Sequence, residues 1–316
     1  MAPRNRNDNR RSFSSDADYT RADLEREFPD DSTCLDWLWR QNLSPNGEHA
    51  ECPKCDTMRR FHRVASRPSY SCDKCGHHLH PTAGTIFHKS STGLDLWFTA
   101  VFMMSSTRCG VSAKQIEREL GVTYKTAWRM ATLIRKHLMD QDDTPLSGDV
   151  ELDETYVGGK PRLKDRRWNP DGSIKKGPGK KKATVFGAVE RGGKVRAEVL
   201  PRGEAPNLAH RASTFVLPES VVFTDEYPAY NRLGDRFARH HRIQHKARIY
   251  VQGDVHTQTI DGFWALLKGG LIGTYHGVSE KWLQGYCNEF AFRYNHRYDR
   301  KPMFLTLLDL TARPVC

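Results

Sequence analysis

The sequence lacks long apolar runs. No stretch approaches the roughly 20 consecutive apolar residues that a membrane-spanning helix requires, and residues 1–18 contain no apolar segment of the kind found in a signal peptide. These residues are polar and rich in Arg, Asn and Ser, a composition that favours disorder. We therefore predict a disordered basic arm over residues 1–19 and a cytoplasmic location for the chain.

Acidic residues are too few to balance the basic ones. The 316 residues include 49 Lys and Arg but only 38 Asp and Glu, which gives a formal net charge of +11. A surplus of cations favours a polyanionic partner, nucleic acid above all, because basic side chains displace condensed counterions without reading sequence. A basic enzyme with no nucleic-acid partner would show the same surplus, so charge alone leaves both interpretations open.

The eight cysteines do not follow the pattern of a disulfide-stabilised protein. Four of them form two CxxC pairs, which in a reducing compartment are more often metal ligands than disulfides: Cys52, Cys55, Cys72 and Cys75. The sixteen residues between the pairs are polar with few core formers, so a metal ion would supply much of the folding energy. We predict a closed site of four thiolates for a structural Zn²⁺ ion, in a helix-plus-zinc-ribbon region at residues 20–90.

Residues 91–145 carry apolar side chains at helical spacing and contain a helix-turn-helix pattern. One helix is predicted to end at Leu120, Gly121 provides the turn, and Thr123 caps a second helix. The second helix presents polar and basic side chains suited to phosphates and base edges: Thr123, Tyr124, Lys125, Thr126 and Arg129. DNA binding is the functional interpretation of this stretch, and an ordinary helical hairpin is the alternative.

From residue 150 the pattern changes to short β segments. The predicted strands are Val150–Val157, Thr184–Val189, Val195–Leu200, Val221–Thr224 and Arg248–Val251. A helix is predicted at Ala205–Phe215, and two more begin near His256 and Ser279, where apolar residues return to the 3.6-residue period. The pattern therefore favours a mixed α/β unit in the second half of the chain.

Three acidic positions stand out by their surroundings. Asp153 lies inside an apolar strand, where a charge needs a partner or a metal ion. Asp225 follows a buried strand at its carboxyl end, and Asp261 lies at the edge of the buried face of the helix that begins near His256. Hard oxygen ligands from two strands and a helix suit two Mg²⁺ or Mn²⁺ ions for phosphoryl transfer on DNA. Glu154 and Glu226 are rival ligands, and three unconnected surface acids are the alternative.

A basic segment follows the first of these acids. Residues 160–182 contain ten Lys and Arg together with prolines and glycines, so they are predicted to form a loop. A solvated surface loop is the simplest interpretation. Its position beside Asp153 favours a grip on DNA, which we assign to Lys180, Lys181 and Lys182.

From about Trp37 to Asn295 the chain resembles insertion-sequence transposases that have an N-terminal zinc ribbon, a helix-turn-helix and a DDE-type catalytic domain. Several motifs carry the resemblance together: the two CxxC pairs, Gly121-Val-Thr-Tyr-Lys-Thr-Ala-Trp-Arg-Met, Asp153-Glu-Thr-Tyr-Val-Gly-Gly-Lys, Val185-Phe-Gly-Ala-Val-Glu, Thr224-Asp-Glu-Tyr-Pro-Ala-Tyr-Asn, His256-Thr-Gln-Thr-Ile-Asp-Gly-Phe-Trp-Ala-Leu-Leu-Lys, Gly273-Thr-Tyr-His-Gly-Val-Ser and Asn288-Glu-Phe-Ala-Phe-Arg-Tyr-Asn. The resemblance implies an α+β, multi-domain protein whose residues 146–300 form a ribonuclease-H-like catalytic domain, followed by a C-terminal tail at residues 301–316.

The resemblance also implies an activity and its residues. Asp153 and Asp225 would be the first two catalytic acids. Family members tend to have Asn and Glu where this chain has Gln258 and Asp261; we choose Asp261 as third ligand, with Gln258 as second choice and Lys268 as the basic companion. The implied reaction is metal-dependent cleavage and joining of double-stranded DNA at element ends, carried out at the nucleoid. Pairing two ends normally requires self-association of the protein.

Two other functions remain open at this stage. The departures at Gln258 and Asp261 leave room for a zinc-ribbon protein that binds DNA but whose catalytic domain has decayed or been adopted for regulation. A nuclease of the same fold that does not transfer strands is the third interpretation. Metal-dependent joining of DNA separates the transposase from both.

Overall fold

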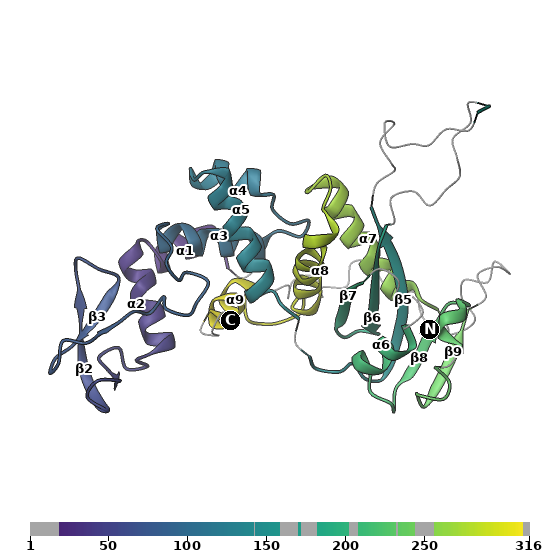
Figure 1. The fold of residues 1–316 in the computed structure, drawn as a ribbon, viewed down its shortest axis with the longest axis horizontal. Coiled ribbons are helices and arrows are strands. Elements are labelled where there is room, and N and C mark those ends of the chain that lie inside the picture. The colour runs from purple at the N-terminus through teal and green to yellow at the C-terminus, as the bar shows by residue number, and fades with distance from the viewer. Residues whose placement is uncertain are drawn as a thin grey trace. The chain divides into compact units, whose positions relative to one another are not determined.

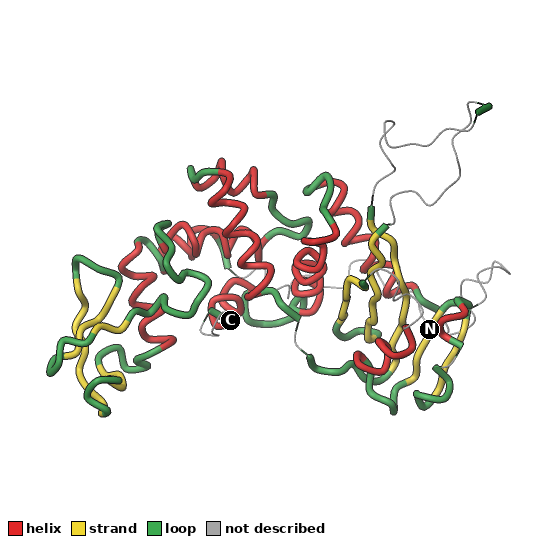
Figure 2. Tube along the Cα trace, viewed as in Figure 1, coloured by secondary structure: helices red, strands yellow, loops and turns green. Residues whose placement is uncertain are grey.

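The computed structural model describes residues 19–141, 143–158, 170–171, 182–201, 208–231, 233–243 and 256–311. The chain forms two compact units: one contains the residues up to Met139 and those from His296 onward, and the other is Asp140–Asn295. Strands occur in two separate groups, one in each unit, and helices accompany both groups (Figure 2). The predicted mixture of helices and strands is therefore confirmed. None of the described helices is long and apolar enough to cross a membrane.

The first unit begins with α1 (Arg21–Glu27) and α2 (Asp31–Asn42) (Figure 1). Thr20 caps α1 and Asp30 caps α2, each side chain accepting a hydrogen bond from a backbone N–H in the first turn. The antiparallel sheet that follows has the strand order β1-β2-β3-β4. Its strands are β1 (His49–Cys52), β2 (Thr57–Val64), β3 (Ser69–Cys72) and β4 (His78–Leu79).

This sheet has little apolar core of its own. Among its eight residues β2 buries only Phe61. The indole ring of Trp39, on α2, stacks on the ring of Tyr70, on β3, with centroids 4.0 Å apart and planes within 10° of parallel. Aromatic stacking between helix and sheet therefore replaces part of the missing core.

The first unit continues with α3 (Leu94–Ser106), α4 (Ala113–Leu120) and α5 (Tyr124–Leu133), which runs into a π-helical turn at Ile134–Leu138. The helix boundaries predicted around the turn agree with the structure. Gly121 ends α4 with a positive φ of 65°, a conformation that favours glycine.

The segment predicted as a C-terminal tail contains α9 (Met303–Leu310). Its apolar residues pack against α3, and the Phe304 ring meets Phe102 edge-on with centroids 5.8 Å apart. Phe304 also contacts Phe28, so α9 completes an aromatic cluster built from three distant parts of the sequence. Apolar residues at helical spacing within residues 303–308 are the sequence pattern from which this helix could have been predicted.

The second unit is a mixed sheet with helices on both faces. Its strands are β5 (Asp149–Val157), β6 (Ala183–Glu190), β7 (Val195–Leu200), β8 (Val221–Thr224) and β9 (Arg239–Arg242). In the order β7-β6-β5-β8-β9, the first three strands are antiparallel neighbours, whereas β8 and β9 run parallel to β5. This topology is consistent with the ribonuclease-H-like arrangement implied by the sequence.

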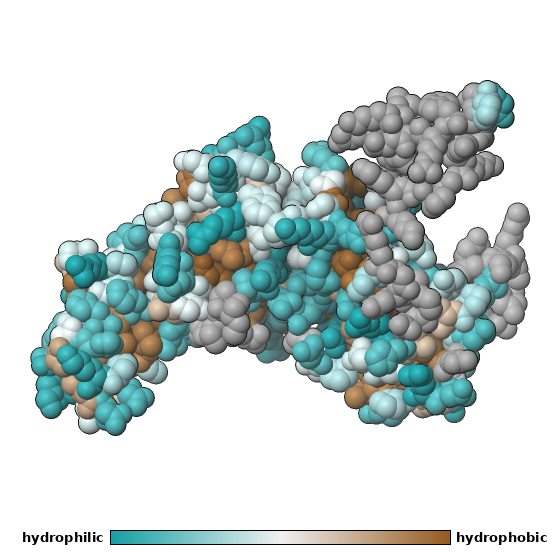
Figure 3. Space-filling view, viewed as in Figure 1, coloured by the Kyte–Doolittle hydropathy of each residue, from teal (hydrophilic) through white to brown (hydrophobic). Residues whose placement is uncertain are grey.

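Helices cover the two faces of this sheet: α6 (Leu208–Phe215) one face, and α7 (Gln258–Gly273) and α8 (Glu280–Asn295) the other. Along β6 the buried side chains alternate between the two cores, with Phe186 packing toward α6 and Val185 toward α7. On the side drawn in Figure 3 the surface is mostly hydrophilic and hydrophobic residues form only small patches.

The outer strand next to β8 is β9, at Arg239–Arg242, which the sequence did not predict. The segment for which one more strand was predicted, Arg248–Val251, lies outside the described residues. The sequence of β9 is Arg-His-His-Arg, which contains no apolar residue, so periodicity could not identify it. Its parallel pairing with β8, from Val221↔Arg239 onward, defines it as a strand.

Side-chain amides cover the free edge of β7. Gln284 accepts a hydrogen bond from the backbone N–H of Val199 and donates one to the carbonyl of Ala197, at 2.8 and 3.1 Å. Asn295 does the same for both backbone groups of Val195. These amides take the place of a neighbouring strand, which protects the edge from pairing with another chain.

Helices α7 and α8 approach closely at Gly270, which gives a first test of the packing. A Cβ atom at Gly270 would lie 2.1 Å from Cζ of Phe290, whereas one at Gly269 would meet no atom within 4 Å. Gly270→Ala is expected to lower the free energy of unfolding by about 1–3 kcal/mol through overpacking. Gly269→Ala is expected to raise it by up to about 1 kcal/mol, because alanine favours the helix. Urea unfolding of both variants measures this, and equal effects would contradict the close approach.

Candidate active site and metal-binding cluster

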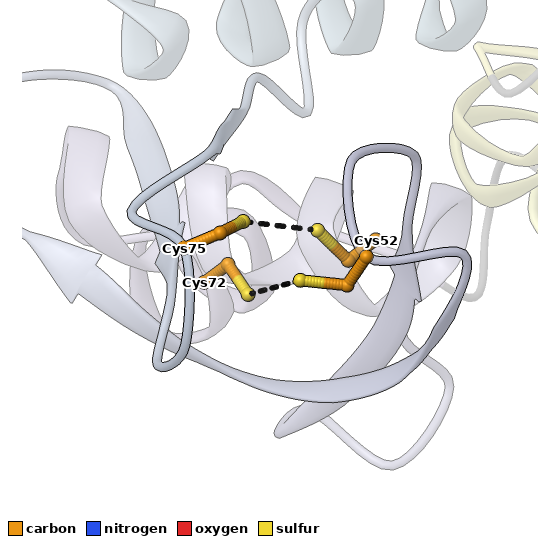
Figure 4. A group of neighbouring side chains, drawn as sticks. Cys52, Cys72 and Cys75 are labelled. Atoms are coloured by element: carbon orange, nitrogen blue, oxygen red, sulfur yellow. Dashed lines mark hydrogen bonds between the residues drawn. The ribbon is translucent and has the colours of Figure 1, made fainter.

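The cysteines of the two CxxC pairs come together in the first unit. Cys52 ends β1 and Cys72 ends β3, and their partners follow in tight turns. Their Sγ atoms all lie within 4.8 Å of one another, with Cys52 and Cys75 3.5 Å apart and Cys55 and Cys72 4.0 Å apart. Figure 4 shows the sulfur atoms pointing toward one another from two facing loops. The four residues form the predicted four-cysteine metal-binding cluster.

The local backbone explains why each pair points inward. The N–H of Cys55 donates to the carbonyl of Cys52, and the N–H of Gly76 donates to that of Cys72, which closes each turn. Gly76 follows the second pair with a φ of 68°. The guanidinium of Arg59, on β2, donates two hydrogen bonds of 2.9 Å to the carboxylate of Asp73 and so ties the second turn to the sheet.

The donor set suits Zn²⁺. Four sulfur atoms in a tetrahedron with Zn–S bonds of about 2.3 Å lie about 3.8 Å apart, close to the two separations above. Burial raises the pKa of the Cys72 thiol, but the backbone N–H groups of Cys75 and Lys74 hydrogen-bond its sulfur and lower the pKa to about 7. These N–H groups favour the thiolate, the form that binds metal.

Metal content tests the cluster directly. The purified full-length protein is expected to hold one Zn²⁺ per chain, and Cys55→Ser is expected to lose both the metal and the thermal transition of the first unit, since metal binding supplies folding free energy. Cys109→Ser is the control, because Cys109 is exposed and outside the cluster. Elemental analysis and a thermal melt measure both quantities. Full zinc content in Cys55→Ser would contradict the assignment.

In the second unit Asp153 lies in the middle of β5, where it faces α7. Its Oδ2 atom accepts a 2.8 Å hydrogen bond from the indole N–H of Trp264. Gly187 is the residue opposite Asp153 on β6, and a Cβ atom there would lie 2.6 Å from the Trp264 ring. The absence of a side chain at Gly187 therefore makes room for the indole that orients the Asp153 carboxylate.

The surroundings of Asp153 disfavour its charge. Burial raises the pKa of this carboxyl to about 7. Repulsion from neighbouring carboxylates adds to the rise, and these are Glu154, Asp225 and Asp261; the hydrogen bond from Trp264 opposes it. A carboxyl group raised in this way by burial and like charges is typical of a functional site, where a cation would relieve the repulsion.

Asp225 follows directly after β8, the strand that runs parallel to β5. The pairing of the two strands ends at Glu151 and Phe223, two residues before Asp153 and Asp225. The Asp225 carboxylate lies close enough to Asp153 to raise its pKa. The backbone N–H of Tyr227 donates to Oδ1 of Asp225 at 2.9 Å and so orients this carboxylate in the turn after β8.

The remaining predicted site residues lie on α7, and all are exposed: the candidate ligands Gln258 and Asp261, and the basic companion Lys268. Asp261 is in the first turn and is close enough to Asp153 to raise its pKa. Within the described residues, the four cysteines are the group of potential ligands whose donor atoms come within 4.8 Å; the three acids are not brought that close.

Glu154 points away from α7, toward the opposite face of the sheet. Its Oε2 atom accepts a 2.7 Å hydrogen bond from the hydroxyl of Tyr230, which is fully buried. Burial raises the pKa of Glu154, and repulsion from Asp225 adds to the rise. This predicted rival ligand is thus held by a partner of its own.

Sequence reasoning missed Glu151, Arg191 and Trp264. Glu151 is fully buried on β5, two residues before Asp153 and on the same face, and it contacts the first turn of α7. The available signal was a second acidic residue at alternate spacing in an apolar strand, which needs a partner as much as Asp153 does.

The predicted DNA-binding residues of the first unit divide into two groups. The hydroxyl of Thr123 accepts a hydrogen bond from the N–H of Thr126, and their Oγ1 atoms are 3.0 Å apart, so both side chains serve the cap of α5. Tyr124, Lys125 and Arg129 are not part of this cap, and all three are exposed. In the basic segment Lys182 is exposed, and the predicted Lys180 and Lys181 lie outside the described residues.

The raised pKa of Asp153 predicts a pH-dependent cost to stability. Its pKa is about 7 in the folded chain against an ordinary 3.8, so between these values the unfolded chain releases a proton that the folded chain keeps, and stability falls as pH rises. Asp153→Asn is expected to raise the free energy of unfolding at pH 8 by about 1–3 kcal/mol, and the gain should shrink toward pH 4.

Urea unfolding at several pH values, without added Mg²⁺ and without a chelator that strips zinc, measures this gain. Asp149→Asn is the control, since Asp149 lies on the same strand but is exposed. A gain that is constant across pH would argue against a raised pKa.

The four-cysteine cluster, the helix pair joined at Gly121 and the mixed sheet, with Asp153 on β5 and Asp225 just after β8, are consistent with a DDE-type transposase. Residues 145–295 match the ISXO2-like transposase domain, and the chain belongs to this family of transposases. It is 31% identical over 254 residues to a Halobacterium salinarum protein described as an uncharacterized protein in transposable element ISH50, an alignment that covers 77% of this chain and 84% of that protein. No solved structure matches the chain.

Proposed function

We propose that the protein is the transposase of an insertion sequence, which binds the ends of its element and catalyses metal-dependent cleavage and joining of DNA strands. The observation that supports this most directly is that Asp225, just after β8, lies close enough to Asp153, on the neighbouring parallel strand β5, to raise its pKa. Asp261, in the first turn of α7, also lies close enough to Asp153 to raise its pKa. Carboxylates from two strands and one helix would then share one site, as the family implies.

Asp153, Asp225 and Asp261 would hold the divalent ions, with Gln258 as the alternative third ligand. When bound, Mg²⁺ or Mn²⁺ supplies the Lewis acidity that phosphoryl transfer on DNA requires. The chain's own residues prepare this site: Asp153 must release its proton to become a ligand, and the Trp264 N–H holds one of its oxygens in place. Lys268 lies seven residues after Asp261, about 10 Å further along the same side of α7, where its ammonium group can attract a DNA phosphate.

DNA binding is assigned to residues 91–145 and catalysis to residues 146–300. Lys125 and Arg129 lie one turn apart on α5 and suit phosphates or base edges, and Tyr124 offers an exposed aromatic ring beside them. Thr123 and Thr126 act through the helix cap. Lys180, Lys181 and Lys182 would contact DNA phosphates, and structural Zn²⁺ in the four-cysteine cluster would stabilise the first unit.

A DNA-binding protein that no longer cuts is the second candidate function. Both Gln258 and Asp261 depart from the residues usual in the family, and the three acids do not come within 4.8 Å of one another in the described chain. The two candidates differ in metal-dependent chemistry and share DNA binding.

Incubation of the zinc-loaded protein with labelled element-end DNA and Mn²⁺ distinguishes them. The parent is expected to nick and join the ends, whereas Asp225→Ala and Asp261→Ala should lose at least about 100-fold in rate, because each removes a charge-stabilising ligand. All should retain end binding. Asp235→Ala, an exposed acid of the same unit, is the control and should keep full activity.

The outcomes separate the proposals. Activity that survives in Asp261→Ala but not in Gln258→Ala moves the third ligand to Gln258. Cleavage without joining leaves a nuclease. Tight binding with no cleavage by the parent contradicts the transposase and supports the DNA-binding protein, in which case Lys125→Ala with Arg129→Ala should still abolish end binding.

A further inference from the structure

Helix α7 begins without a cap of its own. Thr257 occupies the N-cap position, yet its side chain makes no capping hydrogen bond. The first turn of a helix leaves backbone N–H groups without helical partners, and these groups carry the positive end of the helix dipole. An anionic acceptor from elsewhere in the fold can satisfy both needs.

Glu151 supplies this acceptor from the central strand. Its Oε2 atom accepts hydrogen bonds from the backbone N–H groups of Thr259 and Ile260, at 2.8 and 3.1 Å. These are the second and third residues of α7, the positions that an N-cap side chain normally serves. The Thr259 hydroxyl donates to Oε1 at 2.9 Å. A residue of β5 thus caps a helix 108 residues away in sequence.

Arg191 and His256 complete the surroundings of this carboxylate. The Nε atom of Arg191 lies 2.9 Å from Oε1 of Glu151, and its terminal nitrogen donates to the carbonyl of His256 at 2.8 Å. The guanidinium also lies 3.8 Å from the centre of the Phe223 ring, on β8. Nδ1 of His256 is 3.2 Å from Oε1. A fully buried carboxylate is therefore matched by a cation and by hydrogen bonds on both oxygens.

The capping carboxylate and the first candidate acid share one strand face. Glu151 and Asp153 are two residues apart on β5, so both project toward α7, whose first turn carries Asp261. The distance between Asp153 and Asp261 consequently depends on where Glu151 holds the helix. We infer that Glu151, supported by Arg191, is a positioning residue that sets the spacing of the catalytic carboxylates and thereby their affinity for divalent ions. This inference rests on the proposed function.

Substitution of Glu151 tests it in the full-length, zinc-loaded protein. Glu151→Gln keeps the size of the side chain but replaces one acceptor oxygen by a donor, which opposes the N–H groups of α7. Hydrogen exchange of residues 256–264 is expected to accelerate. Mn²⁺ affinity, measured by calorimetry with Mn²⁺ alone, should fall about 10-fold or more, as it does when residues that support metal ligands are removed.

Two further variants keep the test decisive. Glu190→Gln is the matched control: its carboxylate also accepts backbone hydrogen bonds, from Ser147 and Lys194, but it does not contact α7. It should bind Mn²⁺ like the parent. Thr259→Val removes only the hydroxyl bond to Glu151 and should weaken Mn²⁺ binding by about 2- to 5-fold, consistent with one hydrogen bond; it decides the question if Glu151→Gln does not fold.

Unchanged Mn²⁺ affinity in folded Glu151→Gln and in Thr259→Val would overturn the inference, provided that Asp153→Ala abolishes binding. If Asp153→Ala binds Mn²⁺ like the parent, the proposed catalytic site itself is contradicted. A positioning role also predicts that excess Mn²⁺ restores DNA cleavage by Glu151→Gln toward the parental rate. General damage to the fold would lower the rate at every Mn²⁺ concentration.

Discussion

The arrangement of the second unit depends on a carboxylate that does not reach solvent. Glu151 is fully buried on the central strand, where an isolated charge would cost several kcal/mol. Arg191, in the turn between β6 and β7, and the first backbone amides of α7 surround it, so the charge is stable only while strand, turn and helix hold their places. This requirement turns one ion pair into a link between elements. The contacts of Glu151 with α7 thereby also set the distance between this helix and Asp153, two residues further along β5.

The candidate catalytic carboxylates lower the stability of the fold. Asp153 is buried, and it is repelled by Glu154, Asp225 and Asp261, so its pKa rises to about 7. The close packing of Trp264 over Gly187 keeps the carboxylate oriented despite that repulsion. Sites that gather like charges commonly sacrifice stability for function, since a bound cation or substrate relieves the strain only when it is present. The apolar cores on the two faces of the sheet supply the stability that offsets this repulsion.

The first unit achieves stability by different means. Its small sheet buries few apolar side chains, and β2 buries only Phe61. Four cysteines on two turns and the stacking of Trp39 on Tyr70 hold the sheet to itself and to α2. Metal ligation is strong and local, so it can organise a segment too polar to form a core. The helices that follow, α3 and α9, return to ordinary aromatic packing through Phe102 and Phe304.

The parts of this protein that the sequence determined by itself are those with local causes. CxxC spacing identified the cluster at Cys52 and Cys75, residue order defined the turn at Gly121 and the cap at Thr123, and a charge within an apolar strand marked Asp153. Such signals arise from neighbours a few residues apart, whose geometry the backbone fixes.

Tertiary structure alone decided the rest. Strand β9 has no apolar residue and exists only through pairing with β8, and α9 acquires its place by packing on α3. The proximity of Asp225 to Asp153 follows from the parallel pairing of β8 with β5. The role of Glu151 depends on Thr259, 108 residues away, because a buried charge is stable only beside hydrogen-bonding or charged partners, and the fold decides which residues these are.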